Sequence, residues 1–463
     1  MAALASCGGG SGGGSGPPSI SVTSSSAANV VENSSGTIYT ASATLSNGGA
    51  VGFTVAGGAD ASLFSILNTG ELRIIGALDF ERPRDANADN VYELTIRASG
   101  GGVSRDFPVT LTVTNDKEGI SVTRIATGFT NPACVSFLNT VVAPTPSQPG
   151  RIAVGEAGGN IYAVDGTTGA KTLLADAFAG RSADKLLDCR TYRQGASGYY
   201  AGLYAVLRNA DASVVLQRFD RGGLKDSVLL PAGSAAVGIK LLEGSDQQFY
   251  AAVGDSSPSV ALDAASPLGK LHKLVQYDPY AGASLSPGYF TPQIVGDGLR
   301  DPAGGGTING KTLIADRGGS KEHELDFFAP DARPLGFGWP NYEGTEPLVS
   351  SPPAAIIGPT VVYPFGTGAR QGTGIVAGLV YDGPANELKA HYVFGDQRGL
   401  IWSIPLSLLT DGYLHKAPEL ENRTADFKPD VGTIDAPVGF ATDDLGRFYV
   451  LDSDGELFRV DGT

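Results

Sequence analysis

Residues 296–345, GDGLRDPAGGGTINGKTLIADRGGSKEHELDFFAPDARPLGFGWPNYEGT, decide the fold of this chain. Two short strand-like runs, 311–314 and 322–328, lie on either side of the turn 316–319, and the stretch closes on segment 336–342. Short runs that alternate with glycine-rich turns are typical of an antiparallel sheet of short strands. The stretch therefore predicts one sheet-forming unit.

The same alternation of short runs and tight turns returns later in the chain. A supersecondary unit that repeats every few tens of residues is typical of a solenoid or a propeller. Short strands and tight turns also suit a chain with 65 glycines better than helices do. The later units are formed by residues 375–382, 391–396 and 399–405, and by residues 438–442, 447–452 and 455–460.

Charge and hydropathy exclude two kinds of partner. The chain has 463 residues and a net charge of −15, with no basic cluster, and binding to nucleic-acid phosphates depends on such clusters. No run approaches the ~20 apolar residues that a membrane-spanning helix needs.

At ~150 residues per domain, the length allows two or three domains, or a small domain beside a large repeat fold.

The motifs of the quoted stretch resemble a blade of the pyrroloquinoline-quinone-dependent glucose/sorbosone dehydrogenase family, a family of six-bladed β-propellers. Residues 300–302 (RDP), 314–319 (IADRGG), 322–324 (EHE) and 336–344 (GFGWPNYEG) follow the order of that family's R-N-P, D-x-G, E and N-Y-G-W-P motifs. The resemblance implies an all-β fold with a six-bladed propeller at residues 118–463.

Further blades of that family are matched on both sides of the quoted stretch. Residues 254–255 (GD) and 268–271 (LGKL) resemble one blade, and residues 375–383 and 390–404 resemble another. Residues 119–126 (GISVTRIA) precede the first matched blade, so we expect them to join the last blade and close the ring. Closure is how such folds avoid exposed sheet edges.

Two of the three cysteines fall on predicted neighbouring strands. The resemblance makes residues 131–138 and 185–192 the innermost strands of the first two blades, which places Cys134 near Cys189. In an exported protein, two such cysteines form either a disulfide or two buried thiols. Both alternatives stay open at this point.

The third cysteine follows a short motif at the N-terminus. Residues 4–7 (LASC) resemble a bacterial lipobox, in which Cys7 carries the lipid, and a Gly/Ser tether follows up to residue 18. The resemblance implies an exported bacterial outer-membrane lipoprotein, in the periplasm or at the cell surface, that touches the membrane only through its lipid anchor. The alternative is an ordinary disordered start.

Residues 19–117 resemble a cadherin repeat, a β-sandwich of about seven short strands. The resemblance rests on 31–33 (VEN), 78–81 (LDFE) and 115–116 (ND), in the order that cadherins use to bind calcium. It implies calcium ligands at Glu32, Asp79, Glu81 and Asp116, since calcium prefers several oxygen ligands with carboxylates among them. The alternative is four solvated acids at strand ends.

The dehydrogenase resemblance also implies a chemistry, but its catalytic base has no counterpart here. In the family, a histidine takes the hydroxyl proton as hydride leaves a sugar C1. Residues 186–194 align with the histidine-containing motif and contain none; Tyr192 or Arg193 takes its place. Residues 235–238 (AAVG) stand where a second family motif has His-x-Gly-Gly. No catalytic residue is assigned.

Several residues match positions at which the family binds its cofactor. In the family, Arg and Lys side chains hold the carboxylates of pyrroloquinoline quinone, and calcium activates its carbonyls. The matching positions here are Lys270, Arg300, Asp301, Arg317 and Arg398, and arginine suits bidentate binding of carboxylates. The alternative for Arg300 and Asp301 is that they pair with one another.

Several acids and histidines have an ordinary alternative. Asp255, Asp316 and Asp396 follow strand-like runs and either stabilise turns or line a calcium site. The four histidines, His272, His323, His391 and His415, are expected to be structural or solvated. Glu322, His323 and Glu324 cannot all converge on one ion, because adjacent strand residues point to opposite faces.

Two functions from different classes follow. The first is a quinone-dependent aldose dehydrogenase, and the second is a non-catalytic propeller that binds a sugar, a glycan or a surface protein. The ring and the Arg/Lys/Asp set favour the first function. The missing histidine and the cadherin-like segment favour the second.

Overall fold

The computed structural model describes residues 17–138, 150–192, 202–219, 226–258, 260–276, 290–353, 357–410 and 412–462. The chain divides into two compact units between Asp116 and Lys117, one residue before the predicted boundary. Helix in the described residues is confined to three single turns, and none of them is long or apolar enough to cross a membrane. These turns are η1 (Ala61–Leu63), η2 (Asn386–Leu388) and η3 (Ala417–Glu419).

The first unit packs small sheets around one apolar core. Strand β8 (Val91–Gly100) pairs with β9 (Val103–Thr114), and its side chains alternate between core and solvent. Leu94 and Ile96 face the core, where they pack with Leu72 from another sheet. The other strands are β1 (Ile20–Val22), β2 (Ala27–Val31), β3 (Tyr39–Thr40), β4 (Ala43–Leu45), β5 (Gly52–Gly57), β6 (Phe64–Ile66) and β7 (Glu71–Ile74).

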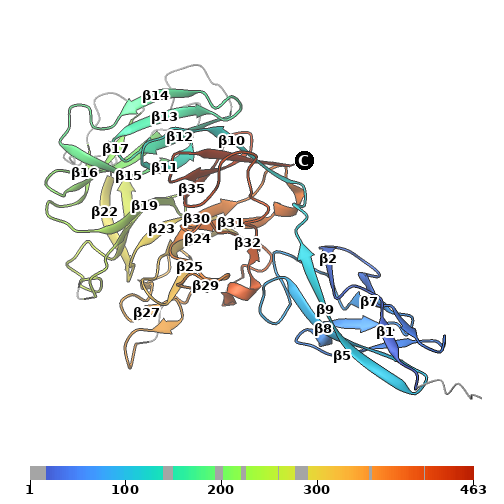
Figure 1. Cartoon of the computed structure of the whole chain (residues 1–463). Coiled ribbons are helices and arrows are strands. Elements are labelled where there is room, and N and C mark those ends of the chain that lie inside the picture. The colour runs from blue at the N-terminus through green and yellow to red at the C-terminus, as the bar shows by residue number, and fades with distance from the viewer. Residues whose placement is uncertain are drawn as a thin grey trace, which may run out of the picture. The chain divides into compact units, whose positions relative to one another are not determined.

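The second unit is a β-propeller with six blades among its described residues. In each blade four strands pair antiparallel, and a short fifth strand is added in parallel in blades 3 and 4. The first strand of each blade contacts the first strand of the next blade around the ring. Figure 1 shows the first strands gathered around the centre of the unit. They are β11 (Pro132–Phe137), β15 (Ala183–Tyr192), β19 (Val237–Glu243), β23 (Pro302–Ile308), β30 (Ile375–Val380) and β35 (Pro437–Thr442).

The outer strands complete the blades in chain order. Blade 1 adds β12 (Arg151–Glu156), β13 (Asn160–Asp165) and β14 (Lys171–Asp176), and blade 2 adds β16 (Gly202–Asn209), β17 (Val214–Arg218) and β18 (Ser227–Leu230). Blade 3 adds β20 (Phe249–Gly254), β21 (Lys270–Gln276), β22 (Phe290–Asp297) and β26 (Leu335–Gly336). Blade 4 adds β24 (Lys311–Asp316), β25 (Glu322–Phe328), β29 (Val361–Pro364) and β33 (His415–Lys416), and blade 5 adds β31 (His391–Asp396), β32 (Ile401–Pro405) and β34 (Glu421–Asn422). A small hairpin of β27 (Tyr342–Glu343) and β28 (Glu346–Pro347) lies outside the blades.

The ring closes as predicted. Strand β10 (Ile120–Ala126), at the start of the unit, pairs with β37 (Leu457–Gly462), which follows β36 (Phe448–Asp452) in blade 6. The last blade therefore takes one strand from the beginning of the unit and three from its end. This pairing covers the edge that an open ring would expose.

Most first strands begin with a β-bulge, and several begin with proline. The register shifts between Pro132 and Cys134, between Pro302 and Gly304, and between Pro437 and Gly439. Proline lacks the N–H of a ladder hydrogen bond and is therefore accepted at the first residue of a strand. Each bulge redirects the side chains that follow it, and these side chains line the axial channel.

Candidate functional site

Buried carboxylates end the second strand of several blades and bind the backbone that leads into the first strand of the same blade. In blade 4, Asp316 accepts the N–H groups of Arg300 and Asp301, at 2.7 and 2.6 Å. Burial raises the pKa of Asp316 to about 7 and that of Asp452 to about 6. The same contact joins Glu156 to Thr130, Asp396 to Thr373 and Gly374, and Asp452 to Asp435 and Ala436.

Of the three aspartates predicted to stabilise turns or line a calcium site, only Asp255 has the turn role alone. Asp255 fits the predicted turn role, because its carboxylate accepts the N–H of Ser257 at 2.9 Å. Asp316 and Asp396 instead connect the second strand to the backbone ahead of the first strand. Their role is to hold the blade together, a role that sequence spacing alone did not distinguish from metal binding.

Arg300 and Arg317 are both engaged with their own chain. The Nη1 of Arg300 donates to the carbonyl of Arg317 at 3.0 Å, its Nε lies 3.4 Å from Glu343 Oε1, and its guanidinium lies 5.5 Å from the ring centre of Trp339. The Nε of Arg317 donates to a backbone carbonyl of β30 at 2.9 Å. Asp301 pairs with Arg317 at 3.4 Å, so Asp301 has an arginine partner other than the one that the alternative reading gave it.

Glu343 completes this cluster, and the sequence analysis missed it. Its carboxylate accepts three consecutive backbone N–H groups, from Gly319, Ser320 and Lys321, at 2.8 to 2.9 Å. Burial acts to raise the pKa of Glu343, but these hydrogen bonds and Arg300 outweigh burial and lower it. Residues 342–344 (YEG) were part of the family match. Nothing in the sequence indicated that the glutamate would accept hydrogen bonds from the turn at 318–321.

The remaining basic side chains are also used internally. Lys270 is buried, its Nζ donates to the carbonyl of Ala261, and burial lowers its pKa. Arg398 donates to the carbonyls of Thr367, Gly368 and Gln371 at 2.8 to 3.1 Å. Lys270, Arg398, Arg300 and Arg317 therefore all bond to groups of their own chain. In this arrangement the four basic side chains do not fit the carboxylates of a quinone.

Tyr192 is one of the two residues that align with the family's histidine. Tyr192 is fully buried, donates its hydroxyl to the carbonyl of Gln247 at 2.8 Å, and lies 3.1 Å from the amide nitrogen of Gln276. Burial raises its pKa, which removes it further from the role of a base near neutral pH. Arg193 lies outside the described residues, and Ala235 carries no titratable group.

The histidines are structural, as expected. His272 and His323 are buried and bond to backbone carbonyls, and burial lowers the pKa of each. His323 packs beside Tyr363, on the face of β25 opposite to Glu322 and Glu324. His415 lies 2.8 Å from a carboxylate oxygen of its own segment. Burial opposes the charge of His391, but the Glu421 carboxylate 3.5 Å away raises its pKa.

Strand β25 carries a second group of buried acids. Glu324 and Asp326 lie on the same face of the strand, and Asp316 lies opposite Glu324 in the neighbouring strand. Burial raises the pKa of both Glu324 and Asp326, and their proximity to other carboxylates adds to the effect. Both carboxylate oxygens of Asp326 are buried without a hydrogen bond to any described residue. These acids favour the protonated form.

An axial channel runs between the first strands and widens at both mouths. The upper mouth, at the starting ends of these strands, is a cavity of about 680 Å³ lined by Asn131, Lys185, Ser234, Lys240 and Ser453 among others. The lower mouth, at their finishing ends, is a cavity of about 400 Å³. A middle chamber of only about 50 Å³ lies between them. Lys240 borders the upper and middle cavities, and Arg190 borders the middle and lower ones.

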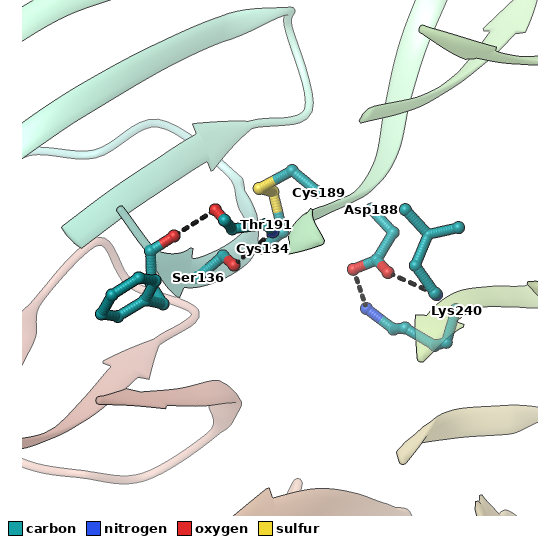
Figure 2. Close-up of a disulfide and its surroundings, with 8 residues drawn as sticks. Cys134, Ser136, Asp188, Cys189, Thr191 and Lys240 are labelled. Atoms are coloured by element: carbon teal, nitrogen blue, oxygen red, sulfur yellow. Dashed lines mark hydrogen bonds and ion pairs between the residues drawn. A yellow bond between two sulfur atoms is a disulfide. The ribbon is translucent and has the colours of Figure 1, made fainter. Parts of the chain in front are cut away.

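Bonds between the first three blades hold the wall of the channel. Cys134 and Cys189 form a disulfide with a Cα–Cα distance of 5.5 Å, which decides between the two alternatives left open by the sequence. Figure 2 shows it between β11 and β15, with Ser136 and Thr191 on one side and Asp188 and Lys240 on the other. Asp188 accepts the N–H of Leu241 at 2.8 Å and lies 3.2 Å from Lys240 Nζ.

The predicted calcium ligands of the first unit are only partly brought together. Glu32 and Glu81 are buried, and one carboxylate oxygen of each lies within 4.8 Å of the other. Glu32 also accepts the N–H groups of Phe80 at 2.8 Å and of Asp116 at 2.7 Å. Asp79 turns toward Arg82, and Asp116 is exposed. Cys7 lies outside the described residues.

Comparison with known proteins supports the fold. No family model and no curated protein matches the sequence. The fold is similar to a crystal structure of glucose dehydrogenase, at 17% identity and a TM-score of 0.52, over 74% of this chain and 99% of that one. A second structure, of a glucose dehydrogenase, matches with the same values. At this identity, the similarity shows that the chain contains a β-propeller of this kind.

Proposed function

We propose that this protein is a non-catalytic propeller that binds a carbohydrate at the upper mouth of its axial channel. One observation carries the proposal: the basic side chains placed to hold a quinone are bonded to carbonyls or carboxylates of their own chain. Tyr192 or Arg193 aligns with one of the family's histidines, and Ala235 aligns with the other. An alcohol oxidation needs a proton acceptor, and none of these residues supplies one near neutral pH.

The upper mouth suits a small saccharide. Its volume of about 680 Å³ lies within the range of ordinary ligand pockets. Asn131, Ser234 and Ser453 offer side chains that both donate and accept hydrogen bonds, and the exposed Lys185 adds a cation. Leu187 and Val438 supply an apolar wall for the C–H face of a sugar ring.

An aldose dehydrogenase is the second candidate, and the similarity to glucose dehydrogenase structures favours it. Pyrroloquinoline quinone would supply the hydride acceptor, and calcium would activate it. The chain would then have to release Arg300, Arg317 and Arg398 from their present partners to hold the quinone.

The other segments extend the proposal. A lipid at Cys7 would anchor the exported protein to a bacterial outer membrane, and the cadherin-like unit would present the propeller to a glycan or a surface protein. Calcium fits Glu32 and Glu81, because a divalent cation would neutralise two buried carboxylates. In that case a chelator lowers the melting temperature of the protein, Glu81→Gln removes this response, and Asp79→Ala leaves it in place.

A binding and turnover experiment tests the proposal. Calorimetry with neutral and acidic mono- and disaccharides is run on the wild type, on Lys185→Gln/Ser453→Ala at the upper mouth, and on Lys389→Gln as an exposed-lysine control. We expect weaker binding only in the upper-mouth variant. In parallel, the protein is mixed with the quinone, calcium, an aldose and an artificial electron acceptor. Turnover above background would establish the dehydrogenase instead.

A further inference from the structure

We propose that the lower mouth is a second, separate binding site, and that it takes a neutral polyhydroxylated ligand such as the end of a saccharide. This site lies at the other end of the channel from the proposed upper-mouth site and shares no polar side chain with it. Two of its polar residues, Glu243 and Gln247, lie outside the motifs of the dehydrogenase resemblance. Its lining, its turn at Gln247 and the narrow chamber behind it favour such a ligand.

The lining combines hydrogen-bonding groups of both kinds with aromatic surface. Arg190, which donates one of its five N–H groups to the carbonyl of Leu241 at 3.3 Å, lines the cavity with Glu243 and Gln247. A guanidinium, a carboxylate and an amide together present the donors and acceptors that the hydroxyl groups of a sugar require. Phe137 and Phe440 add ring surface on which the C–H face of a sugar packs. A cavity of about 400 Å³ holds a ligand of one or two sugar rings.

The strands that carry these groups are joined beside the cavity before any ligand arrives. Thr191 N–H donates to Ser136 Oγ at 2.9 Å, which joins β15 to β11 beside the cavity. Thr307 Oγ1 donates to the carbonyl of Glu243 at 3.1 Å, which joins β23 to the end of β19. Side chains that are fixed in advance lose less entropy on binding and therefore bind more tightly.

Gln247 is the most informative residue of the lower mouth. It lies in the turn between β19 and β20 with φ of +59°, a conformation that favours glycine, asparagine or aspartate. A long side chain in this conformation costs about 1 kcal/mol or more. The buried hydroxyl of Tyr192 donates to its carbonyl and holds the turn. The chain therefore places an amide side chain over the cavity at a position where glycine would have a lower conformational free energy.

The two mouths are separate because the channel between them is too narrow for a sugar. The middle chamber of about 50 Å³ has room for about one or two water molecules. Arg190 extends from β15 toward β23, where its Nη2 lies 3.7 Å from the place that a Cβ on Gly306 would occupy. The disulfide lines the same chamber. A ligand at one mouth therefore does not reach the other.

The test uses the whole protein and three neutral probes: methyl α-glucoside, maltose and cellobiose. Gln247→Gly removes the side chain and suits the positive φ, so we expect its melting temperature to equal or exceed that of the wild type. Its affinity for the best probe should fall by about tenfold, the effect of one or two lost hydrogen bonds. Glu243→Gln, which keeps the shape of the side chain, should weaken binding in the same way.

The upper-mouth variant Lys185→Gln/Ser453→Ala separates this proposal from the proposed function. Binding that survives in this variant but falls in Gln247→Gly supports the lower mouth, whatever happens at the upper one. Binding that falls only in the upper-mouth variant overturns the lower-mouth site and leaves the upper site standing. The lower-mouth proposal is also overturned when none of the three probes binds the wild type at millimolar concentration.

Discussion

Blade 4 and the axial channel use polar side chains in opposite ways. The turns of blade 4 carry the densest match to the dehydrogenases, yet Arg300, Asp316, Arg317 and Glu343 bond to one another or to nearby backbone. At the lower mouth, Glu243 and Gln247 lie outside the matched motifs, yet they line a cavity. In this chain, the motif residues build the propeller, while the residues that offer a ligand surface stand at the strand ends.

The strongest test of this comparison removes a blade carboxylate. Asp396 is fully buried and accepts the N–H groups of Thr373, Gly374 and Arg398 and the hydroxyl of Tyr363, at 2.8 to 3.0 Å. Asp396→Ala leaves these donors without a partner, and each such group costs about 1–3 kcal/mol. We expect a loss of about 4 kcal/mol in the free energy of unfolding, measured with urea.

Asp396→Asn is the matched control for this loss. It keeps the volume of the side chain and one acceptor oxygen, so we expect a smaller loss than in the alanine variant. Saccharide binding per folded molecule should be unchanged in both variants. A stable Asp396→Ala variant with weakened binding would reverse the roles assigned to the two regions.

The next effect concerns the wall of the channel. The disulfide joins two strands across a sequence separation of 55, and a disulfide typically contributes about 2–4 kcal/mol to stability. We expect Cys134→Ala/Cys189→Ala to lose about this much in chemical unfolding. Adding a reductant to the wild type should produce a similar loss, and adding it to the double variant should change nothing. An unchanged midpoint in the double variant would contradict this account.

A smaller effect distinguishes the buried acids of β25 from the bonded acids around them. Burial raises the pKa of Asp316 to about 7 and raises those of Glu324 and Asp326 above their usual range. Because the folded state holds these protons more tightly than the unfolded chain, the contribution of these acids to stability is fully present below about pH 4. It decreases as the pH rises toward about 7, by up to about 1.4 kcal/mol per pH unit for each proton.

Asp326→Asn tests this sign directly. Both oxygens of Asp326 are buried without a hydrogen bond to a described residue, so the neutral amide removes the free-energy cost of holding this acid protonated, or of burying its charge, at pH 8. We expect a gain of about 2 kcal/mol in the free energy of unfolding at pH 8, and a flatter pH profile. A variant that is less stable than the wild type at pH 8 would mean that a cation balances this charge.

The fold was predictable because its pattern is local and repeated. Runs such as 311–314 and 391–396 became strands, and residues 119–126 closed the ring. The partners of the polar residues were not predictable in the same way. Asp301 pairs with Arg317, and Glu343 reaches the turn at 318–321, because the fold brings these positions together. Gln247 gave no signal at all, since its positive φ appears only in the structure.

The smallest effect joins the two regions at Tyr192, which stands at the family's histidine position but supports the lower mouth. Tyr192→Phe keeps the ring that stacks on Phe249 and removes the hydroxyl that donates to the carbonyl of Gln247. One such hydrogen bond contributes about 1 kcal/mol, so we expect a loss of that size in stability. Because the turn at Gln247 loses its anchor, binding of the neutral probes should weaken in this variant, while binding at the upper mouth should not change. Equal weakening at both mouths would show that Tyr192 stabilises the propeller as a whole and has no special connection to the lower site.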